Sequence, residues 1–189
     1  MRIFELKYKL PNIIYYIMNF IPFPTLTTEH LVLRQLKIED QNKIFKLRSD
    51  KNVNKYLDRP KANSLQDALA FIEKINTSIQ NNEALYWAIS LKDHDQLTGT
   101  ICLWNFSKED LTAEIGYELL PEYQGRGIMQ EAFEKVIAFG FEKLNLREIV
   151  AELDQENSRS VKILERNGFI LSKKMKNSVV VYSLNKKTY

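Results

Sequence analysis

The residues best suited to chemistry are two glycines, Gly125 and Gly127, which lie between an apolar stretch and an amphipathic one. Neither glycine places a side chain between the backbone and a ligand. A helix that follows them would present unpaired N–H groups at the positive end of its dipole. A phosphate is the natural occupant of such a place. The simpler alternative is a glycine-rich turn that only joins a strand to a helix.

Two familiar phosphate-binding motifs do not match this segment. No Gly-x-x-x-x-Gly-Lys-Ser/Thr run occurs in the chain, which excludes an ordinary P-loop kinase. The dinucleotide-binding motif requires a third glycine three residues after the second, where this sequence has Gln130. What remains is the pattern Gln-Gly-Arg-Gly-Ile-Met, from Gln124 to Met129.

This pattern resembles the Gln/Arg-x-x-Gly-x-Gly/Ala acetyl-CoA loop of the GNAT superfamily of N-acetyltransferases. Met129 occupies a position that is usually small, but only its backbone N–H is needed for phosphate. A second resemblance lies in Asn157-x-x-Ser160, followed by Leu-Glu-Arg-Asn-Gly-Phe over 164–169. In the superfamily this signature lies on the helix that flanks the thioester.

Two further segments resemble the RimJ/RimL branch, which acetylates the N-terminal amines of ribosomal proteins. They are Glu-Ile-Gly-Tyr at 114–117 and Leu-Val-Leu-Arg at 31–34, and the similarity runs from about Leu26 to Leu184. The resemblance implies a single α/β domain with a mixed, mostly antiparallel sheet flanked by helices. It also implies that the sheet splays between its fourth and fifth strands to admit the pantetheine arm.

The resemblance implies direct acetyl transfer from acetyl-CoA to a primary amine, with no metal. Backbone N–H groups of the loop would hold the pyrophosphate, and strand-like backbone bonds would hold the pantetheine. Arg126 would either add charge or remain a solvated loop residue. The expected cofactor-binding residues are Leu119, Leu120, Gln124, Gly125, Arg126, Gly127, Ile128, Met129 and Asn157.

Two residues are candidates for the chemical step. Glu114 resembles the strand glutamate that acts as the base in the lysine-modifying branch, although it could instead only position the substrate ammonium. At pH 7 about 14% of an α-amine but only about 0.04% of a lysine amine is neutral, so an α-amine needs less help. Many relatives carry a tyrosine where this chain has Leu164. Ser160 is then the remaining hydroxyl for the departing sulfur, unless it only packs the helix.

Two aromatic residues on predicted strands, Tyr117 and Trp87, are expected to line the acceptor site, with packing in the core as the alternative. The lone cysteine, Cys102, lies in an apolar run and reads as a packed strand residue. It cannot form an intramolecular disulfide, which is compatible with a reducing, cytoplasmic compartment.

The elements that must position these residues follow from periodicity. Strands are predicted over 31–37, 85–91, 97–105, 113–120 and 147–153, with a final hairpin over 169–174 and 179–184. Helices are predicted over 38–49, 65–79, 129–144 and 157–167, the second beginning at a capping-box-like Ser64. A chain of 189 residues with 44% hydrophobic content fits one domain.

The first 24 residues are expected to lie outside the core, so that the domain covers 25–189. Basic residues precede an apolar run over 13–23, but no cleavage pattern follows it. The run is also shorter than the about 20 residues that span a bilayer, so no membrane partner is expected. Residues 1–17 are either an upstream extension, or translation begins at Met18.

The acceptor is the least determined feature. The net charge of +3, with basic residues dispersed among 24 acidic ones, argues against nucleic acid as a partner. A protein N-terminal α-amine is the leading acceptor, because the short turn at 173–178 leaves an open groove. The alternatives are a small amine, such as a polyamine, amino sugar or drug, and a CoA-binding module without turnover.

Overall fold

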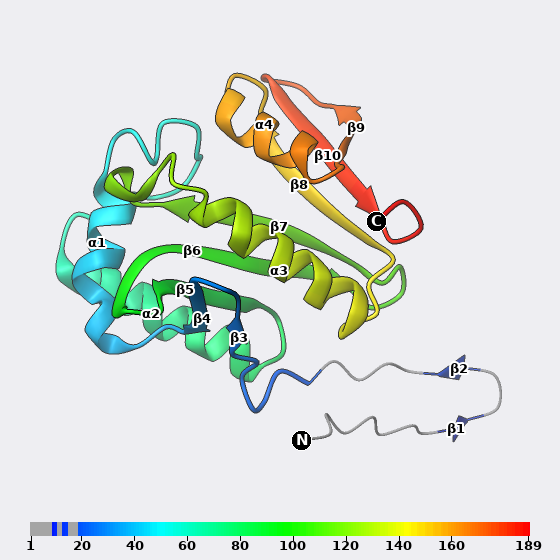
Figure 1. Cartoon of the computed structure of the whole chain (residues 1–189), viewed down its shortest axis with the longest axis horizontal. Helices are drawn as coiled ribbons and strands as arrows, with labels where there is room; N and C mark the ends of the chain where they lie inside the picture. The colour runs from blue at the N-terminus through cyan, green and yellow to red at the C-terminus, as the bar shows by residue number, and fades with distance from the viewer. Residues whose placement is uncertain (1–8, 11–12, 15–18) are drawn as a thin grey trace.

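A mixed sheet of eight strands organises the part of the chain that the computed structural model describes, which is residues 9–10, 13–14 and 19–189. The strand order is β3-β4-β5-β6-β7-β8-β10-β9 (Figure 1). A separate pair is formed by β1 (Lys9–Leu10) and β2 (Ile13–Ile14). The sheet strands are β3 (Leu26–Thr27), β4 (Leu31–Gln35), β5 (Leu85–Leu91), β6 (His94–Ser107), β7 (Thr112–Leu119), β8 (Glu148–Asp154), β9 (Ile170–Lys174) and β10 (Val179–Asn185).

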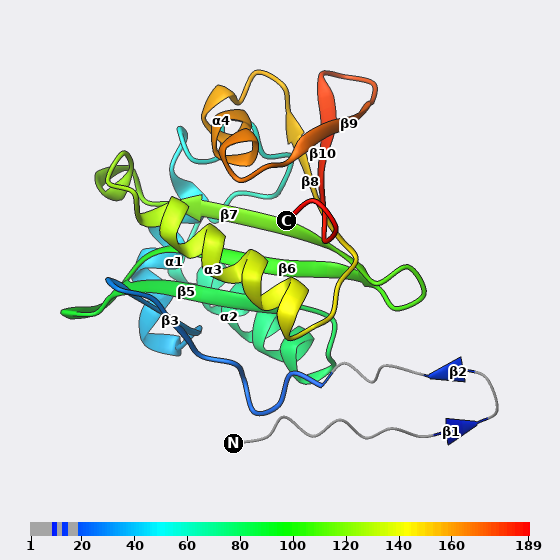
Figure 2. The ribbon, with the colours of Figure 1, turned by 45° about the vertical axis from the view of Figure 1, so that its right-hand side comes forward.

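Helices cover both faces of this sheet. Figures 1 and 2 show α3 on one face, with α1 and α2 on the other and α4 beside β8 and β10. None of the helices in the described residues is both long and apolar enough to cross a membrane. The helices are α1 (Gln41–Ser49), α2 (Leu65–Gln80), α3 (Ile128–Glu142) and α4 (Ser158–Arg166), with short 3-10 turns η1 (Ile38–Asp40) and η2 (Pro121–Tyr123).

The helices begin and pack as their sequences predict. Ser64 caps α2 by accepting from the Asp67 N–H at 3.2 Å, and the Asp67 carboxylate accepts from the Ser64 N–H at 3.1 Å. One side of α3 is buried against the sheet, including Phe133 and Phe141. This apolar side fixes the helix, and therefore the loop that precedes it.

The sheet splays between β7 and β8, which correspond to the expected fourth and fifth strands. These two strands are parallel and pair over only three positions, from Thr112 with Glu148 to Glu114 with Val150. Beyond Glu114, β7 continues to Leu119 without a partner on this side. The expected splayed, mostly antiparallel sheet is therefore confirmed.

The folded domain begins earlier than the sequence predicted. Phe20 is 1% exposed, and its ring lies 5.2 Å from that of Phe106. Its N–H donates to the Asn82 side chain at 2.6 Å. The expectation that the first 24 residues lie outside the core is therefore wrong for Phe20, which is buried, and for Phe23, which packs against the core. The expected extension or alternative start over 1–17 lies outside the described residues, apart from the short β1–β2 pair.

Candidate active site

The glycine-rich loop lies between η2 and α3 and is open to a ligand. Gly125 and Gly127 have φ values of +75° and +78°, which side chains rarely adopt. A Cβ atom added at either glycine would meet nothing within 4 Å. These glycines thus give the backbone its turn and leave the space in front of it free.

Six consecutive backbone N–H groups at this loop are available. The N–H groups of Tyr123 and Gln124 donate within the preceding turn, at 2.9 and 3.2 Å. Among the described residues, no acceptor pairs with the N–H groups from Gly125 to Gln130, and no side chain caps α3 at Gly127. Donors that converge at the positive end of a 15-residue helix suit a pyrophosphate. The loop therefore fits the phosphates of acetyl-CoA.

The Gln124 side chain holds the loop against its neighbours. Its amide nitrogen donates to the Leu119 carbonyl at 3.0 Å, and its oxygen accepts from Arg159 of α4 at 2.5 Å. Gln124 thereby links β7, the loop and α4. Arg126 is exposed, with its guanidinium 5.8 Å from the centroid of the Tyr123 ring.

The register of β7 decides which backbone groups face the splay. The N–H of Leu120 donates to the Thr98 carbonyl at 3.0 Å, so even-numbered residues of β7 bond to β6. Because alternate residues of a strand point their backbone groups to opposite neighbours, those of Tyr117 and Leu119 face the gap. Leu119 is thus placed for a strand-like bond to pantetheine. Leu120 is not, because its N–H is already bonded and its side chain is fully buried.

The start of α4 lies at the splay and carries the second set of expected residues. The Asn157 side chain caps this helix by accepting from the Ser160 N–H at 3.3 Å. The Ser160 carbonyl accepts from the Tyr117 hydroxyl at 3.4 Å. Leu164, where many relatives carry a tyrosine, is fully buried. Tyr117 therefore lies with Ser160, beside the thioester end of the expected site.

Glu114 lies on the opposite face of β7. Side chains alternate along a strand, so Glu114 points away from the α3 side on which Tyr117 lies. Burial, and then repulsion from Glu152, raises the pKa of the Glu114 carboxyl, while a hydrogen bond from Asn105 opposes the rise. A half-buried carboxylate with a raised pKa is a suitable base for an ammonium.

The structure does not bring Trp87 to this site. Its indole is fully buried, and its N–H donates to the Pro24 carbonyl at 2.7 Å. Its ring packs edge-to-face on Phe139 of α3, with centroids 5.8 Å apart. The expectation that Trp87 lines the acceptor site is therefore wrong, since a core position has no access to a substrate.

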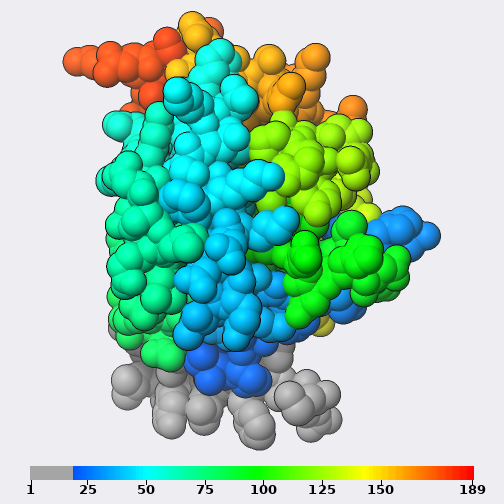
Figure 3. All heavy atoms as spheres, turned by 90° about the vertical axis from the view of Figure 1, so that its left-hand side faces the viewer, coloured from blue at the N-terminus to red at the C-terminus, as the bar shows by residue number. Residues whose placement is uncertain are grey.

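A buried polar cluster that the sequence did not predict lies on the Glu114 face of β7. The Glu118 carboxylate pairs with Arg59 at 2.5 Å and accepts from the hydroxyls of Tyr86 and Thr100 at 3.3 Å. Arg59 belongs to the segment between α1 and α2, which lies beside residues 120–130 in Figure 3. A glutamate near the end of a buried strand was a signal for such a partner. The sequence around Arg59 did not indicate that this arginine would be the partner.

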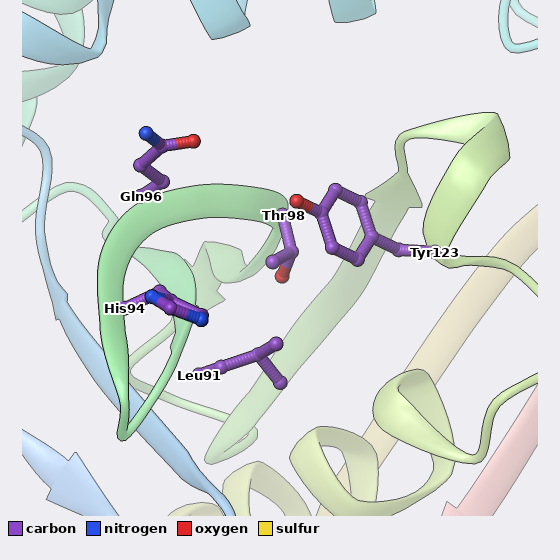
Figure 4. A pocket seen from close by; sticks show the side chains of 5 residues that line it. All are labelled: Leu91, His94, Gln96, Thr98 and Tyr123. Carbon is purple, nitrogen blue, oxygen red and sulfur yellow. The ribbon is translucent and has the colours of Figure 1, made fainter.

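A hollow of about 240 Å³ lies beside the β5–β6 hairpin, away from the splay. Figure 4 shows the Tyr123 ring on one side of it and His94 on the hairpin opposite. Its lining residues come from the hairpin and η2, and not from β8 or α4. The hollow is therefore separate from the candidate active site. It is lined by Leu91, His94, Gln96, Thr98 and Tyr123.

A splayed sheet, a glycine-rich loop with free N–H groups and a half-buried carboxylate beside the gap are the features expected of an acyl-CoA-dependent transferase. The model of the acetyltransferase (GNAT) domain matches residues 30–170. The chain therefore belongs to the GNAT family, is an N-acetyltransferase, and uses acetyl-CoA as its acetyl donor.

Individual relatives agree with this assignment. The chain is 33% identical over 147 residues to an uncharacterized N-acetyltransferase, YoaA, of Bacillus subtilis, covering 78% of this chain and 83% of YoaA. It is 34% identical over 145 residues to the uncharacterized N-acetyltransferase p20 of Bacillus licheniformis, covering 77% and 82%. A solved GNAT acetyltransferase from Bacillus anthracis has the same fold, with a TM-score of 0.76 at 22% identity over 87% of this chain and 99% of that one.

Proposed function

We propose that this N-acetyltransferase acetylates the N-terminal α-amine of a protein, with the pyrophosphate of acetyl-CoA held by the free backbone N–H groups from Gly125 to Met129, in a loop that the Gln124 side chain positions. Leu119, the loop and Asn157 bind the donor. Glu114 assists the amine, and Ser160 solvates the departing sulfur. Acetyl-CoA supplies an activated acetyl group, and the chain supplies position, a base and hydrogen-bond donors.

The charge around Glu118, near the end of β7, supports the proposal for an α-amine. Arg59 neutralises Glu118, and Arg48 lies close enough that burial and Arg59 together lower the pKa of its guanidinium. None of the described carboxylates forms an ion pair with Arg48, whose charge lies 3.9 Å from the centroid of the Phe71 ring. Two guanidinium groups against one carboxylate make the cluster of Arg48, Arg59 and Glu118 positive, whereas Glu114 and Glu152 make the face negative nearer the start of β7.

The positive cluster of Arg48, Arg59 and Glu118 bears on the choice between the candidate acceptors. A polyamine would bring further ammonium groups against Arg48 and Arg59, and like charges at close range disfavour binding. A peptide presents one ammonium at its end, followed by a neutral backbone. The α-amine also loses its proton more readily than a lysine amine, which suits a single assisting carboxylate such as Glu114.

Named relatives support both acceptor classes. A ribosomal-protein-serine acetyltransferase of Escherichia coli is 36% identical over 77 residues, covering 41% of this chain and 43% of that protein. A spermidine N(1)-acetyltransferase of Vibrio cholerae is 25% identical over 140 residues, covering 74% and 79%. The positive cluster of Arg48 and Arg59 around Glu118, together with the lower pKa of an α-amine, favours the first class.

An acceptor screen tests the proposal, with release of free thiol from acetyl-CoA as the readout. Peptides with varied N-termini are compared with spermidine and an aminoglycoside. The matched control is the same peptide with a blocked N-terminus and one internal lysine. We expect kcat/KM to be highest for free N-termini. A higher kcat/KM for spermidine than for every peptide would replace the proposal with the polyamine alternative.

A further inference from the structure

Tyr117 reaches across the splay from β7 to α4. Its hydroxyl donates to the backbone carbonyl of Ser160 at 3.4 Å. Its ring packs edge-to-face on Phe133 of α3, with centroids 5.0 Å apart and planes at 86°. Phe133 in turn packs on Phe169 at 5.8 Å. The phenol is therefore held on rigid elements, with its hydroxyl at the first turn of α4.

The site needs a hydrogen-bond donor at this place. When the C–S bond of a thioester breaks, its electron pair goes to sulfur, and a buried thiolate without a donor is costly. Position 164 of α4 offers only a fully buried leucine. The Ser160 hydroxyl is one candidate donor, and the Tyr117 hydroxyl lies at the same residue, 3.4 Å from the Ser160 backbone carbonyl.

We propose that Tyr117 is a catalytic residue whose hydroxyl donates a hydrogen bond to the sulfur of CoA as it departs, in partnership with Ser160. The inference rests on the proposed acetyl-CoA site. The amine nitrogen forms its bond to the acetyl carbon, the C–S bond breaks, and sulfur takes the electron pair. The proton released by the amine ends on sulfur, so that the products are an acetamide and a free thiol.

The existing contact of Tyr117 is easily exchanged. An O–H···O distance of 3.4 Å lies beyond the usual range of about 2.5–3.0 Å, so the hydroxyl gives up a weak bond when it turns to sulfur. Burial raises the pKa of Tyr117 to about 12. The phenol therefore stays protonated at any pH at which the enzyme works. Since a thiol has a pKa of about 8.5, Tyr117 acts as a hydrogen-bond donor and retains its own proton.

The first test replaces only the hydroxyl. Tyr117→Phe keeps the packing on Phe133, and we expect kcat to fall about 100-fold, the scale of one lost transition-state donor. The KM for acetyl-CoA should change less than threefold. Tyr182→Phe is the matched control, because Tyr182 also bonds to α4, at Glu165 (3.3 Å), but outside the splay. A Tyr117→Phe enzyme as active as the control would overturn the inference.

The second test does not depend on turnover. Affinities for CoA and for desulfo-CoA, which lacks the sulfur, are measured by calorimetry from pH 6 to about pH 9.5, a range that spans the ordinary thiol pKa. In the wild type, the affinity for CoA relative to that for desulfo-CoA should rise with pH as the thiol ionises. Tyr117→Phe should lose at least half of that preference and bind desulfo-CoA normally. An unchanged ratio in Tyr117→Phe would refute the role at sulfur.

The same measurement separates this inference from the proposed function. If the folded wild type binds neither CoA nor desulfo-CoA, the acetyl-CoA site itself is wrong, and the role of Tyr117 falls with it. If both ligands bind and only the pH-dependent preference is insensitive to Tyr117→Phe, the site stands and the inference fails. A double variant with Ser160→Ala should lose less than the product of the two single losses, because both hydroxyls serve one sulfur.

Discussion

Arg59 and Glu118 form an ion pair of 2.5 Å that ties the segment between α1 and α2 to the middle of the sheet. The Glu118 side chain is only 7% exposed and that of Arg59 is 22% exposed. Arg59 also donates to the Asn54 side chain at 2.8 Å, and Asn54 bonds to backbone carbonyls at the end of α1. The pair therefore fixes the segment that lines the proposed acceptor side, and it neutralises the Glu118 carboxylate.

Removing Arg59 should destabilise the protein strongly. Arg59→Met leaves a buried carboxylate without its partner, which costs about 3 kcal/mol or more. The double variant with Glu118→Gln should recover part of this loss, because no buried charge remains. Urea unfolding at pH 7 measures the free energies. Lys46→Met is the matched control, since it breaks an exposed pair with Glu122 and should cost less than about 1 kcal/mol. An equal loss in both single variants would contradict this view of the pair.

A side chain at Gly127 should abolish binding of acetyl-CoA. Gly127→Asp adds bulk and negative charge in front of six free N–H groups, where the phosphates are expected. Gly168→Asp is the control for backbone strain, because Gly168 has a similar φ of +81° at the end of α4. Calorimetric titration with acetyl-CoA should show a loss of at least 100-fold only at Gly127. Normal affinity in a folded Gly127→Asp protein would remove the basis for the cofactor site.

Local patterns predicted the parts of the site that depend on neighbours in sequence. The glycine spacing predicted the loop, and the apolar stripe over 129–144 predicted α3. The capping-box-like sequence at Ser64 predicted the start of α2. The splay came from the family resemblance, because periodicity identifies a strand but not the strand beside it.

The remaining errors have one physical cause, which is that register and long-range packing are not local. Whether a backbone group of β7 faces the splay depends on whether its position is odd or even, so Leu119 faces the splay and Leu120 does not. The same parity brings Tyr117 to Ser160. Arg59 and Glu118 lie 59 residues apart, and neither neighbourhood indicates the other. Phe20 belongs to a short apolar run that has no period to reveal its burial.

Phe20, in the segment 19–24, should be required for stability, whereas residues 1–17 should not be. Deletion of residues 1–17 should leave a cooperative melt, whereas Phe20→Ala should cost about 3 kcal/mol or more through the cavity it leaves. Ile21→Ala is the control, because Ile21 is 50% exposed and its loss should be small. Thermal and urea melts measure both. If Phe20→Ala were as stable as Ile21→Ala, the packing on Phe106 would contribute nothing.

The hydroxyl of Ser160 should affect turnover more than cofactor affinity. Ser160→Ala should lower kcat by about 10- to 1000-fold, the scale of one lost transition-state donor, with little change in the dissociation constant of acetyl-CoA. Ser158→Ala alters the same turn of α4 at an exposed position and serves as the control. Steady-state rates and titrations on both variants separate the two quantities. Equal kcat values for Ser160→Ala and Ser158→Ala would mean that Ser160 only packs the helix.

The pH dependence of the rate should report on Glu114. Its pKa is raised by burial and then by repulsion from Glu152, and the carboxylate is the form that can accept a proton. The rate should therefore rise with pH through this raised pKa. Glu152→Gln removes the repulsion and should move the acid limb of kcat/KM to lower pH, because the Glu114 carboxyl then ionises more easily.

Glu114→Gln tests the same assignment from the other side. It should remove the acid limb and slow an internal lysine more than an N-terminal α-amine, because far less of the lysine amine is neutral near pH 7. Lys108→Met is a control at an exposed site in the β6–β7 connection and should leave the profile unchanged. Profiles of kcat/KM for both acceptors from pH 4.5 to about pH 9 bracket the ordinary glutamate and α-amine pKa values. Identical profiles in the wild type, Glu152→Gln and Glu114→Gln would mean that the amine loses its proton before it reaches Glu114.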